Sequence, residues 1–174
     1  MPVSRVRATT RWIVPLLLLA AAPTTGQVRL ADAAKRTPFR ASYTTTGVAT
    51  PCGTQTVCVR VSGMGQGTQL GRTSTLAKRV VVRHGSMSCA LGRTSSYTAD
   101  ITLTAANGDT ITLRGSGTSC AGPGGSQASG IYQVTGGTGA FSGARGSLVE
   151  TIMRVGSAPE SLTLDGTLFH RRTR

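Results

Sequence analysis

The sequence predicts an all-β protein that folds as a single closed antiparallel β-barrel of about eight strands. Short runs rich in threonine and valine recur between glycine-marked turns, and no long segment after residue 34 has the apolar period of an α-helix. A barrel leaves no exposed strand edge, which would be an aggregation hazard in such a chain. The predicted strands, eight or nine in number, cover residues 39–48, 57–62, 68–76, 78–84, 96–105, 110–115, 131–135, 148–155 and 161–169.

The first 33 residues have the organisation of a secretory signal peptide. Arginines at positions 5, 7 and 11 precede an apolar run over residues 12–22, and Ala31-Asp32-Ala33 forms an A-x-A cleavage site. The apolar run is shorter than the ~20 residues that a transmembrane helix needs. We therefore expect a signal peptide over 1–33, a barrel domain over 34–174 with no transmembrane segment, and a secreted protein. An uncleaved N-terminal anchor is the alternative.

Four cysteines agree with export, because an even number in a secreted chain of this size indicates disulfides. They can pair in three ways. We favour Cys52–Cys58 with Cys89–Cys120, since Pro51-Cys52-Gly53-Thr54 resembles a turn that would bring Cys58 close. A zinc site would need closely spaced pairs such as C-x₂-C, which the chain lacks. We expect no metal and no cofactor.

One hairpin can be derived residue by residue. Ile101 and Leu103 alternate with polar residues, as do Ile111 and Leu113, and Gly108 lies in the loop between them. A two-residue turn would place Leu103 opposite Thr112 and mix the two faces. A three-residue loop ending with Gly108 in the left-handed region places Leu103 opposite Ile111, and this register is the one we predict.

A second turn is glycine-rich and carries one aromatic residue and one arginine. Its pattern is Gly136-Gly137-Thr138-Gly139-x-Phe141-x-x-Ala144-Arg145-Gly146. This pattern resembles the motif of plant dirigent proteins. Together with the Ala105–Thr110 hairpin, it is also similar to bacterial exported proteins with an allene oxide cyclase-like barrel. The resemblance covers about residues 96–151 and implies an eight-stranded antiparallel barrel.

The matched residues have structural roles in this interpretation. Gly136, Gly137 and Gly139 supply backbone conformations closed to other residues, and Phe141 plugs one end of the barrel. Arg145 either ties down the turn through carbonyl groups or lies free in solvent. The families' catalytic residues have no matching positions here, so cyclase or radical-coupling activity does not follow from the resemblance.

The charge of the chain is strongly positive. Residues 34–174 carry 15 Lys and Arg against five Asp and Glu, a net charge of +10. Arginines outnumber lysines 17 to 2, which together with the alanine, glycine and threonine content is typical of a GC-rich bacterial genome. Such a charge favours anionic partners, including envelope polymers, although it also serves solubility. Specific nucleic-acid binding is not expected, because the six aromatic residues after residue 33 are widely spaced.

Catalytic motifs are absent from the sequence, and Glu150 is the single carboxylate of interest. If Leu148 and Ile152 face the lumen, Glu150 does too and would be the best general acid or base in the chain. The opposite face, Val149-Thr151-Met153-Val155, is at least as apolar, so we predict Glu150 on the outer wall. Tyr132 and Val134 could line the lumen and contact a ligand, although a tyrosine at such a position is more commonly part of the core.

These observations favour a non-enzymatic role, in which the barrel mouth binds a small apolar ligand. A cyclase, isomerase or coupling-directing enzyme is the first alternative, and a basic protein that binds envelope polymer is the second. A desolvated acid in the lumen beside a tyrosine or arginine would favour the enzyme.

We expect the secreted protein to begin at Ala34, because alanines at positions 31 and 33 are the small residues that a signal peptidase accepts. The intact mass of protein from the culture medium tests this. A species that retains residues 1–33 would contradict it.

Overall fold

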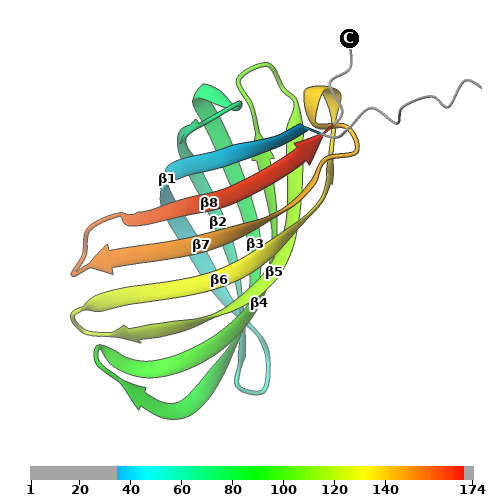
Figure 1. The fold of residues 1–174 in the computed structure, drawn as a ribbon. Helices are drawn as coiled ribbons and strands as arrows, with labels where there is room; N and C mark the ends of the chain where they lie inside the picture. Colours follow the sequence, from blue (N-terminus) through cyan, green and yellow to red (C-terminus); the bar gives the residue numbers. More distant parts are fainter. Residues whose placement is uncertain (1–34, 171–174) are drawn as a thin grey trace, which may run out of the picture. The chain divides into compact units, whose positions relative to one another are not determined.

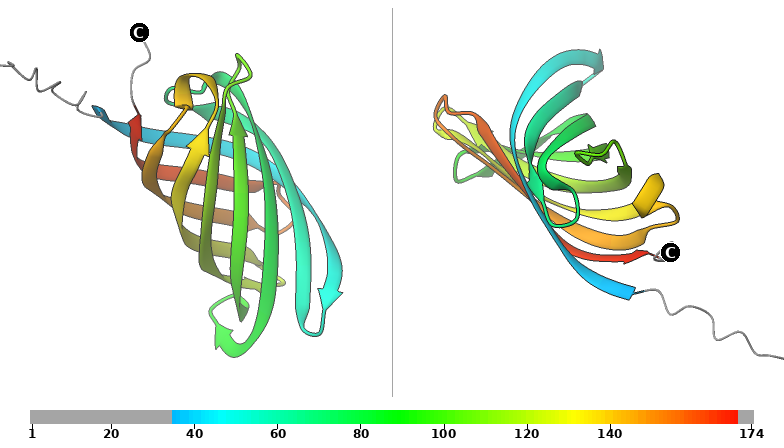
Figure 2. Two further views of the ribbon diagram at one scale, coloured as in Figure 1. Left: turned by 90° about the vertical axis from the view of Figure 1, so that its right-hand side faces the viewer. Right: turned by 90° about the horizontal axis from the view of Figure 1, so that it is seen from above.

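The computed structural model describes residues 35–170, which form a closed barrel of eight antiparallel strands in chain order (Figures 1 and 2). This architecture confirms the predicted fold class. The strands are β1 (Lys35–Gly53), β2 (Thr56–Gly67), β3 (Gly71–Cys89), β4 (Gly92–Thr104), β5 (Thr110–Gly122), β6 (Gly125–Gly137), β7 (Arg145–Val155) and β8 (Glu160–His170), with a short 3₁₀ helix, η1 (Gly139–Phe141), between β6 and β7. Strand β8 pairs with β1 and closes the barrel.

Alternation of side chains along each strand decides what fills the barrel. Inward positions hold most of the large apolar residues, and the most deeply buried lie towards the end that carries η1. They include Phe39, Leu70, Leu76, Ile101, Leu103, Ile111, Leu113, Leu148, Leu162, Leu164 and Leu168. The outer wall is largely threonine, serine and arginine, as the period-2 rule for a half-buried strand requires.

The sequence places the strands correctly but underestimates their length. Residues 68–76 and 78–84, predicted as two strands, belong mainly to β3, whose 19 residues run without a break through Ala77. Ala77 is an outward position that pairs with Ser62 on β2 and Thr102 on β4. A small residue there does not interrupt the strand, because both neighbouring ladders continue past it.

Both favoured disulfides are present. Cys52–Cys58 closes the end of the β1–β2 hairpin, and Cys89–Cys120 joins the end of β3 to β5, which lies on the other side of β4. No free cysteine occurs in the described range. The predicted signal peptide lies outside the described residues. Within residues 35–170 no helix is long and apolar enough to cross a membrane.

The β4–β5 hairpin has the predicted three-residue loop, residues 106–108, which is closed by a 2.8 Å hydrogen bond from the Ala105 N–H to the Asp109 carbonyl oxygen. Leu103 lies opposite Ile111 and Ile101 opposite Leu113, so all four side chains enter the core. Gly108 has φ = +89°, in the left-handed region. This register keeps all the apolar residues of the hairpin on one face of the sheet. The two-residue turn would have exposed half of them.

The two motif segments of the sequence form one cap at the same end of the barrel (Figures 1 and 2). Asp109, which directly follows the hairpin loop, accepts a hydrogen bond from the backbone N–H of Ala140 in η1 at 2.9 Å. Phe141 is 3% exposed and belongs to the core. Arg145 donates to the carbonyl oxygens of Thr135 and Ala144 at 3.3 and 2.8 Å, so it ties down the turn.

Gly108→Val should lower the free energy of unfolding by about 1–2 kcal/mol, because a β-branched side chain is penalised at positive φ. Nothing lies within 4 Å of a Cβ placed on Gly108, so the cost comes from the backbone and not from a clash. Urea denaturation measures it, with Asn107→Gly as the milder control. Equal stability of Gly108→Val and the wild type would contradict the backbone argument.

Candidate functional site

A buried ion pair lies in the barrel lumen between strands β3 and β7. Lys78 Nζ donates to Glu150 Oε1 at 2.5 Å, and the two side chains are 2% and 0% exposed. Lys78 is an inward position between Leu76 and Val80, and Glu150 is one between Leu148 and Ile152. Each charged side chain therefore lies among the inward-facing apolar residues of its strand. A charge without a partner would be strongly unfavourable there.

Two tyrosines complete the coordination of the carboxylate. Tyr97 on β4 and Tyr132 on β6 each donate a phenolic hydrogen bond to Glu150 Oε2, at 2.8 and 2.9 Å. The Lys78 ammonium also lies 5.2 Å from the centre of the Tyr97 ring and 5.8 Å from that of Tyr132. Three donors from three strands thus hold both oxygens of Glu150. We call these four residues the lumen cluster.

Two glycines on β5 make room for the tyrosine rings. A Cβ on Gly117 would lie 2.5 Å from the Tyr97 hydroxyl oxygen, and a Cβ on Gly115 would lie 2.7 Å from the Tyr132 ring. Both glycines occupy inward positions that would otherwise carry a side chain. A larger residue at either position would collide with these rings and with a backbone carbonyl oxygen of β6, which lies 2.2 Å from the Cβ position in both cases.

Burial keeps the phenols of the lumen cluster protonated. Desolvation raises the pKa of Tyr97 and of Tyr132 well above the usual value of 10.0, and the negative charge of Glu150 raises both further. Both tyrosines therefore stay hydrogen-bond donors over the physiological pH range.

A cavity of about 810 Å³ occupies the lumen next to the cluster. Lys78 and Tyr97 line it, and its walls are otherwise mostly small or apolar: Gly47, Ala49, Val59, Val61, Val80, Val82, Ala121, Ala128 and Ile152. A volume of this size is within the range of small-molecule sites. The cavity therefore has a mainly apolar wall, and Lys78 and Tyr97 are the members of the lumen cluster that line it.

Polar residues lie where the cavity opens, near the β7–β8 turn. Glu160, Arg154 and His84 line this part. Glu160 accepts a hydrogen bond from the Thr45 hydroxyl at 3.2 Å, and the His84 ring is 3.4 Å from the Ser95 hydroxyl. The lumen thus has a polar rim, an apolar middle and the charged cluster further in.

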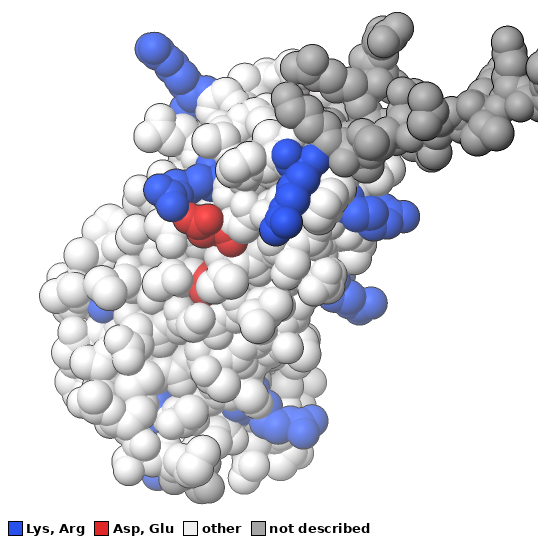
Figure 3. Space-filling view, viewed as in Figure 1, with Lys and Arg blue, Asp and Glu red and all other residues white. Residues whose placement is uncertain are grey.

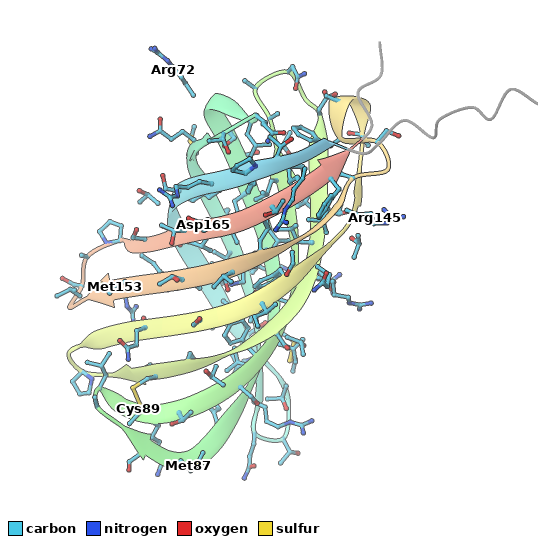
Figure 4. All side chains as sticks on the ribbon, viewed as in Figure 1. Arg72, Met87, Cys89, Arg145, Met153 and Asp165 are labelled. Carbon is cyan, nitrogen blue, oxygen red and sulfur yellow. A yellow bond between two sulfur atoms is a disulfide. The ribbon has the colours of Figure 1, made fainter. Side chains whose placement is uncertain are left out.

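The prediction that Glu150 lies on the outer wall is wrong. Glu150 is fully buried, whereas Val149, Met153 and Val155 are 48%, 54% and 70% exposed, and Figure 4 shows Met153 on the outside of the barrel. The two faces of β7 are similarly apolar, so the strand's own sequence does not decide between them. The decisive partner is Lys78, 72 residues away in the chain.

The other two predicted lumen residues are buried but stand apart from the cavity. Tyr132 is 0% and Val134 3% exposed, and both point into the barrel. Neither lines the cavity, so their contact with a ligand remains a prediction. Within residues 35–170 no group of His, Cys, Asp and Glu side chains could hold a metal ion.

Lys78 and Tyr97 were not identified from the sequence, although a signal existed for each. Tyr97 shares the parity of Ile101 and Leu103, whose inward face the hairpin register had already determined. Lys78 shares the parity of Leu76 and Val80, but dividing β3 at Ala77 concealed this alternation. A lysine on an otherwise apolar strand face calls for a buried acidic partner.

All three tyrosines of the chain should resist ionisation until the barrel unfolds. Burial also raises the pKa of Tyr43, so each phenol has a higher pKa in the folded than in the unfolded protein. The resulting stability is fully present below pH 10 and declines as the pH rises above it. Tyrosinate absorbance should therefore appear cooperatively with loss of circular dichroism. A reversible titration near pH 10 in the folded protein would contradict this.

No protein-family model matches the chain, and no curated protein matches it in sequence. Among solved structures, it is similar to the pterocarpan synthase dirigent protein GePTS1, with a TM-score of 0.53 and 16% sequence identity over 91% of this chain and 100% of that one. At this identity the likeness concerns the fold alone. The chain therefore has the dirigent-like fold of an eight-stranded antiparallel barrel, as its hairpin and glycine-rich turn predicted.

Proposed function

We propose that the barrel lumen binds a small, mainly apolar molecule and rearranges it by proton transfer, as an isomerase- or cyclase-type enzyme. The observation that supports this most is the buried Lys78–Glu150 pair beside a cavity of about 810 Å³. Buried, closely coupled titratable groups next to a cavity are typical of acid–base sites. We place the protein outside the cytoplasm, because both of its disulfides agree with the expected secretory signal.

Each residue of the cluster has a role in this reaction. Lys78 and Tyr97 line the cavity, so they contact a polar atom of the ligand. The Lys78 ammonium stabilises negative charge that develops on a ligand oxygen. As Tyr97 takes a proton from the ligand, its own proton passes to Glu150 along the 2.8 Å hydrogen bond, and the reverse transfer returns a proton to another ligand atom. The protonation state of the cluster is restored, and no electron is gained or lost.

A binding protein without catalysis is the second candidate. Glu150 already accepts three hydrogen bonds and does not itself line the cavity. A ligand could therefore be held by Lys78 and Tyr97 with no proton leaving it. The two candidates share the cavity and differ only in what Glu150 does.

Native mass spectrometry of protein purified from its own culture medium should show a small molecule that is released on unfolding. Ala128→Trp, which fills the cavity, should abolish this complex, and Val82→Trp provides a second filling variant. Ser129→Trp is the matched control, because it adds the same side chain to the outer face of the same strand. Equal ligand content in Ala128→Trp and Ser129→Trp would exclude the lumen as the site.

Glu150→Gln separates catalysis from binding. The amide is close in size to the carboxylate but is a far weaker proton acceptor, so turnover per folded molecule should fall by about 10²- to 10⁴-fold while ligand binding persists. Because Lys78 loses its partner charge, thermal melts of the variant establish the folded fraction to which both measurements refer. The molecule released from Glu150→Gln should be converted by wild-type protein into an isomer of equal mass and different chromatographic retention. If wild type leaves that molecule unchanged, the protein binds and does not catalyse.

A further inference from the structure

We propose that the outer wall carries a second site, distinct from the lumen, in which Arg60, Arg79 and Arg114 bind a phosphate-bearing polymer that lacks nucleobases. The three arginines belong to one row that crosses neighbouring strands. Arg60 on β2 pairs with Arg79 on β3, Arg79 with Asp100 on β4, and Asp100 with Arg114 on β5. We call these four residues the outer row.

The outer row contains an unfavourable like-charge pair. Arg60 and Arg79 lie directly opposite each other and are both exposed on the outer face. Directly opposed side chains on neighbouring antiparallel strands have Cβ atoms about 4.5–5.5 Å apart, and like charges there are destabilising. An anion between the two guanidinium groups would relieve the repulsion.

The carboxylate in the row offsets this repulsion only in part. Asp100 lies opposite Arg79 but forms its ion pair with Arg114, at 3.1 Å. Among residues 35–170, no hydrogen bond or ion pair to another side chain engages Arg60 or Arg79. The neighbours of the same parity carry no charge on either strand: Ala77 and Val81 beside Arg79, and Cys58 and Ser62 beside Arg60. The outer row thus has a net charge of +2, concentrated at the end formed by β2 and β3.

The same residues line a hollow on the outer wall. Its volume is about 560 Å³, and its lining includes all four members of the outer row. Thr98 and Ser116 add hydroxyl groups that can donate to oxyanions. The basic side chains on the face in Figure 3, by contrast, stand mostly apart from one another.

Phosphate groups are suitable ligands for the arginines of the outer row, and a polymer of phosphates can contact more of them than a single ion can. Planar guanidinium groups bind phosphate through paired N–H donors. Strands lie about 4.8 Å apart, so Arg60 and Arg114 are roughly three strand spacings apart and present separated contacts to one extended chain. No aromatic residue lines the hollow, which argues against single-stranded nucleic acid, whose bases need stacking platforms.

Isothermal titration calorimetry with a linear polyphosphate at several salt concentrations tests the site. Arg60→Gln and Arg79→Gln should each weaken binding by about fivefold, as expected of exposed charge contacts. Each should also reduce the slope of log affinity against log salt by about one. Asp100→Asn should tighten binding, since it removes the competing carboxylate. Thermal melts should show that all these variants stay folded.

Arg72→Gln is the matched control, because it removes the same charge from an exposed arginine that extends away from the barrel (Figure 4). It should leave affinity and slope unchanged. Equal losses in Arg72→Gln and Arg79→Gln would show diffuse attraction and overturn the site. Inorganic phosphate that competes as well as polyphosphate, at equal phosphate concentration, would reduce the site to a single-ion one. Tighter binding of a charge-matched single-stranded DNA would identify a nucleic-acid surface instead.

Discussion

The interior of this barrel depends on one constraint, which is that the carboxylate of Glu150 must be fully compensated. Removing either member of a buried pair commonly costs about 3–5 kcal/mol, because the remaining charge is left without a partner. Lys78 supplies the opposite charge, and two phenols occupy the second carboxylate oxygen. Strands β3, β4, β6 and β7 are therefore all tied to one side chain, and a shift of any of them by one residue would turn a polar group out of the lumen.

The same constraint shapes the surroundings of the cluster. Tyrosine rings can reach Glu150 only because Gly115 and Gly117 leave their inward positions empty. Towards η1, large side chains such as Leu164 and Leu168 fill the barrel, whereas small ones such as Ala128 leave the cavity on the other side. The lumen is thus packed on one side of the cluster and open on the other, and the cluster forms the boundary.

The sequence predicted what depends on local rules and missed what depends on distant pairing. The preference of a three-residue loop for glycine predicted the positive φ of Gly108. The requirement that apolar side chains share one face predicted the register of Ile101 and Leu103. The disulfide pairing followed from chain order and one turn. Glu150 was misplaced because both faces of β7 are apolar enough to be a core, and only a lysine on β3 decides between them. A buried pair joins two strands that share no ladder, so no short-range pattern reveals it.

A buried ion pair is a poor device for stability, because well-packed apolar residues of similar volume often serve as well or better. The Lys78–Glu150 pair therefore asks for another explanation. A role in fixing the register of the strands would be a sufficient explanation if the lumen cluster were buried on all sides. Lys78 and Tyr97, however, face a cavity that apolar residues could have filled. Both residues line that cavity with a carboxylate behind them, and a purely structural pair would not need this position, which is what supports the functional role proposed for the cluster.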